Sequence, residues 1–115
     1  METQINRGDI YFAKLDPVIG SEQGGIRPVL ILQQNKGNQT GPTVIAAAIT
    51  GQANKRPDLP THIPVECESL EKDSVVLIEQ IRTLDKTRLL RYIGTASDET
   101  MAAVGKAIQY NMGVE

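Results

Sequence analysis

Short apolar stretches, separated by polar segments rich in glycine and proline, occupy most of this chain up to residue 96. Six of these stretches have the length, the alternation or the β-branched content that is typical of strands. They span residues 9–15, 26–34, 43–51, 61–67, 73–84 and 89–96. Pro64 cannot donate to a strand ladder, so we expect the fourth stretch at an edge of the sheet. Residues 35–42, between the second and third stretches, are turn formers and are expected to form the loop of a hairpin.

This hairpin allows a strand register to be predicted. If its loop is symmetric, the centre lies between Asn38 and Gln39, and residues whose numbers sum to 77 face each other. Arg27 and Thr50 form one such pair. Directly opposed residues have Cβ atoms about 4.5–5.5 Å apart, so these two side chains are expected to converge at one end of the hairpin. A bulge or a slip of one residue breaks this register.

The only helical pattern follows the last predicted strand. Ser97 is suited to an N-cap, and Asp98 and Glu99 in the first turn complement the helix dipole. Gly105 costs such a helix about 1 kcal/mol relative to alanine, and Gly113 is a natural stop. The predicted apolar face consists of Met101, Val104, Ile108 and Met112. Six short strands, glycine-rich turns and one C-terminal helix indicate a mainly β fold, a small and partly open barrel.

Composition and charge narrow the class of protein. At 115 residues and 12.5 kDa, the chain is expected to form one domain spanning residues 1–115. No apolar run reaches the roughly 18 residues of a membrane span, and the N-terminal residues lack an apolar signal region, so a cytosolic protein is expected. The net charge of -2 provides no global basic field, so a nucleic-acid site has to be a local patch of Lys and Arg. Cys67, the one cysteine, has no partner for a disulfide or a zinc site and is expected to be a small buried residue.

The stretch GSEQGGIRPVLILQ, residues 20–33, carries the clearest candidate chemistry. Gly24 and Gly25 permit positive φ and close backbone approach, and Pro28 has no N–H for a ladder. Arg27 therefore stands where a loop becomes a strand. Arginine binds phosphate well because its planar guanidinium carries several donors and keeps its charge at physiological pH. The alternative is a surface arginine in a salt bridge, which this stretch alone favours because arginine is usually exposed.

Further polar residues are predicted to surround Arg27 and Thr50. Their amide, hydroxyl and charged groups suit hydrogen bonding to the unpaired bases and ribose hydroxyls of single-stranded RNA, and they equally fit a solvated loop surface. The predicted RNA-binding residues are Ser21, Glu22, Gln23, Asn35, Gln52, Lys55, Thr61, His62, Gln80 and Arg82. His62 is the only histidine, which excludes a two-histidine ribonuclease mechanism; it fits a structural hydrogen bond or a ligand contact. The sequence has neither a phosphate-binding P-loop spacing nor a local carboxylate pair of a metal nuclease, so no cofactor and no metal are expected.

Four short motifs, taken in order and with their spacing, carry a family resemblance. They are RGDI (7–10), GSEQGGIRP (20–28), AAIT (47–50) and EQIRT (79–83). From about Arg7 to the C-terminal helix, the chain closely resembles the MazF/PemK family of toxin endoribonucleases, the mRNA interferases. The resemblance implies a toxin of a type II toxin-antitoxin system, with an SH3-like barrel shared with the CcdB toxins. It also implies a homodimer, a small acidic MazE-like antitoxin that covers the RNA groove, and sequence-specific, metal-independent cleavage of single-stranded RNA.

By the same resemblance, the catalytic arginine of the family falls on Arg27 and its catalytic threonine on Thr50. Some family members carry histidines where this chain has Ser21 and Ile26, so the acid and base roles do not carry over. The expected mechanism is attack of the ribose 2′-OH on the adjacent phosphate, with Arg27 and Thr50 stabilising the phosphorane and Glu22 as a candidate base. The alternative function is a non-enzymatic CcdB-like toxin that binds DNA gyrase through the same barrel and needs no Arg/Thr pair.

Overall fold

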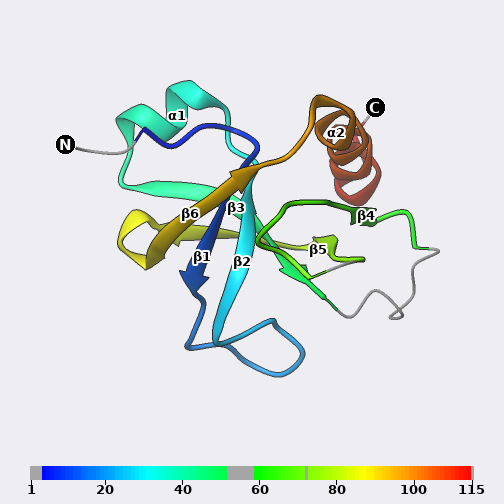
Figure 1. The fold of residues 1–115 in the computed structure, drawn as a ribbon. Coiled ribbons are helices and arrows are strands. Elements are labelled where there is room, and N and C mark those ends of the chain that lie inside the picture. The colour runs from blue at the N-terminus through cyan, green and yellow to red at the C-terminus, as the bar shows by residue number, and fades with distance from the viewer. Residues whose placement is uncertain (1–3, 52–58, 72, 115) are drawn as a thin grey trace.

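The computed structural model describes residues 4–51, 59–71 and 73–114, and within them six strands form one antiparallel sheet (Figure 1). The strands are β1 (Asp9–Lys14), β2 (Ile26–Ile31), β3 (Thr43–Thr50), β4 (His62–Pro64), β5 (Val75–Asp85) and β6 (Leu89–Thr95). The helical elements are α1 (Asn35–Thr40), the short 3₁₀-helix η1 (Lys86–Arg88) and α2 (Asp98–Met112). The strand order is β4-β5-β3-β2-β1-β6, so the sheet is open between β4 and β6. This arrangement confirms the mainly β, partly open fold with a C-terminal helix.

All six predicted strands are present, and several end earlier than expected. β4 is an edge strand, as Pro64 predicted. β2 ends at Ile31 instead of residue 34, because the N–H groups of Leu32 and Gln33 both donate to the carbonyl of Ile45, at 2.8 and 3.2 Å. Two donors on one acceptor end the regular ladder, and the chain turns away into α1.

The prediction of a loop at residues 35–42 was wrong, because the segment contains α1. Its sequence favours turns, and contacts outside the segment stabilise the helix. Asn38 is buried, its Nδ2 donates to the carbonyl of Gln33 at 2.9 Å, and Lys86 Nζ donates to its carbonyl oxygen. The predicted register nevertheless holds, since Val29 pairs with Ala48 and the next two pairs follow in step.

The core lies on both faces of the sheet. Alternation along the strands separates it into two clusters, because successive residues of a strand point to opposite faces. Ile10 and Leu30 belong to the cluster beneath α2, whereas Tyr11 and Val29 belong to the other. Figure 1 shows α2 beside β4 and β5, where Val104 enters the first cluster.

The caps of α2 agree with the prediction. Ser97 Oγ accepts a hydrogen bond from the Thr100 N–H at 3.1 Å, and Gly113 ends the helix with φ at 68°. The predicted apolar face is wrong at its last position, since Met112 is 63% exposed. Asn111 faces the sheet instead, with Nδ2 3.3 Å from the carbonyl oxygen of Ile78, and Met112 is turned away by about 100° of helix rotation. None of the described helices is long and apolar enough to cross a membrane.

An irregularity in β5 shapes the region near the site. Ala47 of β3 pairs with Ile81, whereas Ile49 pairs with Val76, so residues 77–80 of β5 face the single residue Ala48. Such a bulge bends the strand and turns side chains out of the regular alternation. The bulge therefore divides β5 into a part that pairs with β4 and a part that pairs with the first half of β3.

Candidate active site

Arg27 lies at the beginning of β2, half-buried and opposite Ala13 of β1. Its Nε donates a hydrogen bond of 2.7 Å to the carbonyl oxygen of Gly24. Gly24 has no room for a side chain, because a Cβ there lies 2.7 Å from Asp16 Oδ1 and 2.7 Å from Val18 Cγ2. The bond to Gly24 uses one of the five N–H donors of the guanidinium. The group is thus oriented by the backbone and retains donors for an anion such as phosphate.

Thr50 is the last residue of β3, 5% exposed, and pairs with Val75 of β5. The β2–β3 ladder runs to Val29 and Ala48, two positions short of Arg27 and Thr50. Because β2 begins where β3 ends, both residues belong to the same end of the hairpin. A guanidinium and a hydroxyl at one end of two neighbouring strands are the kinds of donors that suit an anionic ligand.

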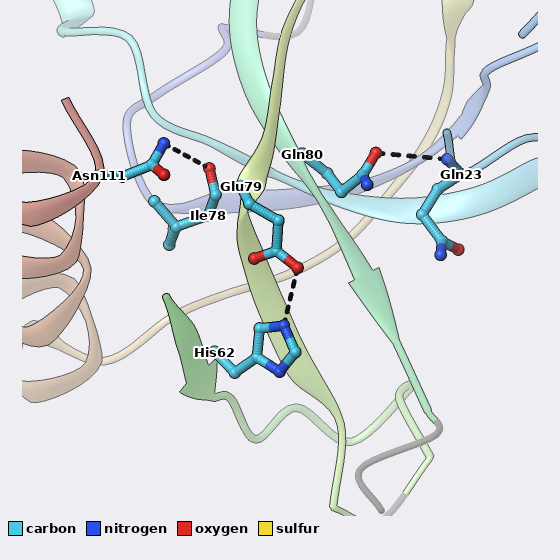
Figure 2. Close-up of polar contacts among 6 residues, drawn as sticks. All are labelled: Gln23, His62, Ile78, Glu79, Gln80 and Asn111. Atoms are coloured by element: carbon cyan, nitrogen blue, oxygen red, sulfur yellow. Dashed lines mark hydrogen bonds and ion pairs between the residues drawn. The ribbon is translucent and has the colours of Figure 1, made fainter. Parts of the chain in front are cut away.

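The loop of residues 15–25 is tied to β5 by side chains that were predicted as site residues. Figure 2 shows the Gln23 N–H donating to Gln80 Oε1 across 3.4 Å. Arg82 Nη1 donates to the carbonyl oxygen of Leu15 at 3.2 Å. β5 therefore holds both ends of the loop whose Gly24 carbonyl orients Arg27.

Ser21 and Glu22 lie at the exposed tip of the same loop. Glu22 Oε1 accepts a hydrogen bond of 2.7 Å from the N–H of Ile19, and the Glu22 N–H donates to the Ile19 carbonyl at 3.3 Å. The loop's own backbone thus orients this carboxylate, and the second carboxylate oxygen adds an acceptor at the loop tip.

His62 and Glu79 form a hydrogen bond between β4 and the bulge of β5, with His62 Nε2 2.7 Å from Glu79 Oε2 (Figure 2). The His62 side chain is 5% exposed and that of Glu79 is 38% exposed. Burial alone raises the pKa of Glu79, but the hydrogen bonds from His62, from the Glu79 backbone and from Thr61 outweigh it and lower this pKa below its ordinary value. His62 therefore has the structural hydrogen bond that the sequence left open as one of two possibilities.

Glu79 was not among the predicted site residues, although it belongs to the EQIRT motif. The signal that could have found it is its position beside Gln80, in the motif that also supplied Arg82. In Figure 2, the side chains of Glu79 and Gln80 leave β5 in different directions, one toward β4 and the other toward the loop of Gln23. Consecutive residues of a strand point to opposite faces, which separates these two side chains, and both residues lie within the bulge of β5.

The remaining predicted residues lie apart from Arg27 or outside the described ranges. Asn35 begins α1 beyond the other end of β2, and its Oδ1 accepts a hydrogen bond of 2.6 Å from the Arg7 N–H. Thr61 is buried next to His62. Gln52 and Lys55 fall within residues 52–58, outside the described residues. The structure therefore gathers the loop residues with Gln80 and Arg82, and it separates Asn35 from them.

Cys67 is half-buried, where the sequence predicted a buried residue. Its Sγ donates to the carbonyl oxygen of Ile93 at 3.3 Å, and the side chain packs at the margin of the first core cluster. In the described ranges, no three side chains of His, Cys, Asp or Glu are grouped so that they could hold a metal ion.

The chain is similar to known toxins over nearly its whole length. The family model described as "PemK-like, MazF-like toxin of type II toxin-antitoxin system" matches residues 6–112. This chain belongs to that family. A member of the same group, the endoribonuclease MazF of Staphylococcus saprophyticus, is 54% identical over 112 residues, which cover 96% of this chain and 92% of the relative.

Solved structures of MazF proteins have the same fold. The crystal structure of MazF from Deinococcus radiodurans matches with a TM-score of 0.84 at 24% identity, covering 98% of this chain and 100% of that one. The Mycobacterium tuberculosis toxin MazF-mt6 matches with a TM-score of 0.77 at 28% identity, covering 93% and 98%. An endoribonuclease in complex with its cognate antitoxin, from a mycobacterial species, matches with a TM-score of 0.76 at 24% identity, covering 99% and 98%.

These similarities confirm the family and the enzyme class expected from the sequence, an endoribonuclease toxin of a type II toxin-antitoxin system. The alternative, a CcdB-like protein that binds gyrase, is not favoured, because both the family model and the 54% identical relative are of the MazF type.

Proposed function

We propose that this MazF-like toxin cuts single-stranded mRNA at particular sequences, using the 2′-OH of the substrate as the nucleophile and no metal ion. One observation carries the proposal: Arg27 is oriented by Gly24 at the end of the hairpin where Thr50 ends the neighbouring strand. An arginine held by its Nε has its remaining donors available for the two oxygens of a phosphate. A second donor from the adjacent strand suits a phosphorane, which carries more negative charge than the substrate.

In the proposed reaction, the ribose 2′-oxygen forms a bond to the adjacent phosphorus and the bond from phosphorus to the 5′-oxygen breaks. The products are a 2′,3′-cyclic phosphate end and a 5′-OH end. Glu22 accepts the proton of the 2′-OH, and Arg27 delivers a proton to the departing 5′-oxygen. Arg27 and Thr50 also donate hydrogen bonds to the phosphoryl oxygens, which lowers the energy of the transition state more than that of the bound substrate.

The RNA is proposed to lie along the loop of residues 15–25. Ser21 and Gln23 offer hydroxyl and amide groups to bases and ribose, and Arg82 adds positive charge beside the loop. Gln52 and Lys55 lie outside the described residues, and the sequence predicts that they extend this surface. Thr61 and His62 are assigned to the support of Glu79 rather than to RNA contact, because both are buried.

We propose that the toxin acts in the cytoplasm as a homodimer and is neutralised by a small acidic antitoxin. Two related toxins with this fold, from Deinococcus radiodurans and a mycobacterial species, have been solved in complex with an antitoxin. An acidic chain competes with RNA for the same cations, Arg27 and Arg82. Large apolar side chains such as Ile26, Leu90 and Tyr110 are 65%, 54% and 67% exposed, and a symmetric pairing can bury some of them.

Cleavage of a defined RNA tests the proposal. A long single-stranded RNA is incubated with the protein and every cut is mapped for its 5′-OH end. Replacing the ribose on the 5′ side of one cut by deoxyribose should abolish that cut, and a chelator should change nothing. In single-turnover reactions, Arg27→Ala should lose about 10³-fold in rate and Thr50→Ala about 10²-fold.

The matched control is Arg91→Ala, which removes an exposed arginine of β6 and should leave the rate unchanged. Circular dichroism confirms that each variant is folded. A folded Arg27→Ala protein that cuts as fast as the wild type contradicts the assigned role of Arg27. Cleavage of the deoxy substrate contradicts the 2′-OH mechanism.

A further inference from the structure

Three consecutive residues in the bulge of β5 make contacts with three different parts of the molecule (Figure 2). The carbonyl oxygen of Ile78 accepts a hydrogen bond from Asn111 of α2 at 3.3 Å. Glu79 pairs with His62 of β4 at 2.7 Å. Gln80 Oε1 accepts a hydrogen bond from the Gln23 N–H at 3.4 Å. Contacts to α2 and β4 therefore fix the backbone from which Gln80 extends to the loop.

The contact of Gln80 leads directly to Arg27. Gln23 is bonded covalently to Gly24, and the Gly24 carbonyl oxygen accepts the 2.7 Å hydrogen bond from Arg27 Nε. The Gln23 N–H and the Gly24 carbonyl belong to the two peptide units that flank the planar Gln23–Gly24 unit. Holding the Gln23 N–H therefore anchors the chain one residue before the Gly24 carbonyl and limits how far that carbonyl can move. Movement of that carbonyl turns the guanidinium with it.

We propose that Gln80 is a positioning residue, which acts through Gln23 and Gly24 to orient the guanidinium of Arg27 and does not itself read RNA. The inference rests on the proposed catalytic role of Arg27. Its physical basis is that Gln80 uses an acceptor oxygen for the contact, on a strand segment that α2 and β4 both hold. Displacement of a reacting group by about 1 Å is enough to cost as much as 10²-fold in rate.

The chemistry of the amide separates positioning from RNA recognition. A glutamine that reads a base uses its NH₂ donors together with its oxygen. A glutamine that holds the Gln23 N–H needs only the oxygen. Glutamate has nearly the same shape and keeps an acceptor oxygen, but it has no donor. Gln80→Glu therefore preserves the positioning contact and removes any donor to RNA.

Single-turnover cleavage of one short RNA, with the protein in saturating excess, tests this role. Gln80→Ala should lower the rate at saturation by about tenfold, and Gln80→Glu should stay within about threefold of the wild type. Gln33→Ala is the matched control, because the Gln33 side chain, just beyond β2, also makes one long hydrogen bond, to the carbonyl oxygen of Thr43 at 3.3 Å, at the other end of the hairpin. A Gln80→Glu rate as low as that of Gln80→Ala, or an unchanged Gln80→Ala rate, overturns the proposal.

A double-mutant comparison distinguishes this inference from the proposed function. Arg27→Lys keeps a cation but removes the Nε–H that Gly24 accepts, so adding Gln80→Ala to it should lower the rate by less than about twofold. A full further loss of about tenfold shows that Gln80 acts independently of Arg27 and refutes the positioning role. If Arg27→Lys and Arg27→Ala both cut at the wild-type rate, it is the proposed function that fails.

Discussion

Substituting alanine for Gly24 should impair catalysis far more than folding. The added Cβ lies 2.7 Å from both Asp16 Oδ1 and Val18 Cγ2. Ordinary contact between such atoms is about 3.5–4.0 Å, so one side must move by about 1 Å. Asp16 is exposed and can swing away, but the β-branched Val18 has few alternative rotamers. The backbone of the loop should therefore shift, and the Gly24 carbonyl with it.

The size of the effect follows from the contact of Gly24 with Arg27. A shift of about 1 Å in the carbonyl that orients the guanidinium should lower the single-turnover rate by about 10- to 100-fold, or about 1.4–2.7 kcal/mol. The loop is largely exposed, so the loss of unfolding free energy should stay near 1 kcal/mol. Cleavage of a short RNA at saturating protein, together with urea unfolding, measures both quantities.

Gly41→Ala is the control for this substitution. Gly41 follows α1 at the other end of the hairpin, has φ at -110°, and a Cβ there meets only the Gly37 carbonyl oxygen at 3.7 Å. Its cleavage rate should equal that of the wild type. A stable Gly24→Ala protein that also cuts at the wild-type rate refutes the reasoning, because the Gly24 carbonyl then does not govern Arg27.

Three further predictions concern stability. Gly105→Ala should stabilise the protein by about 0.5–1 kcal/mol without changing cleavage, since a Cβ at this helical position meets nothing within 4 Å; a lowered melting temperature contradicts this. Ser97→Ala should lower the free energy of unfolding by about 1 kcal/mol in urea titrations, because it removes the acceptor of the Thr100 N–H; an unchanged midpoint shows that the cap contributes nothing. Folding lowers the pKa of Glu79 below its unfolded value of 4.5. The ionised Glu79 carboxylate therefore stabilises the folded protein above pH 4.5, and this stabilisation is lost as the pH falls through the pKa of Glu79 in the folded protein. Glu79→Gln should therefore narrow the difference in unfolding free energy between pH 7 and pH 4, and parallel pH profiles for both proteins count against this pair.

The six strands and the C-terminal helix could be predicted because their signals are local. Alternation with period two marks the strands, Ser97 and Gly113 cap α2 by contacts within one turn, and Pro64 identifies an edge strand from its missing N–H. The β2–β3 register was also predictable, because the connection proved symmetric about residues 38 and 39 even though it folds as α1. The assignment of Arg27 and Thr50 as catalytic residues rests on that register and on the family resemblance, and it stays a prediction.

Tertiary structure decided the features that depend on partners far apart in the sequence. α1 forms in a turn-rich segment because Asn38 is buried and bonded by Lys86, 48 residues away. Gln80, 57 residues away, holds the loop of Gln23 by a hydrogen bond. It lies in a bulge of β5 that no local sequence pattern predicted. Periodicity specifies which face of a strand is apolar, but it does not specify which polar atoms meet once the strands are side by side.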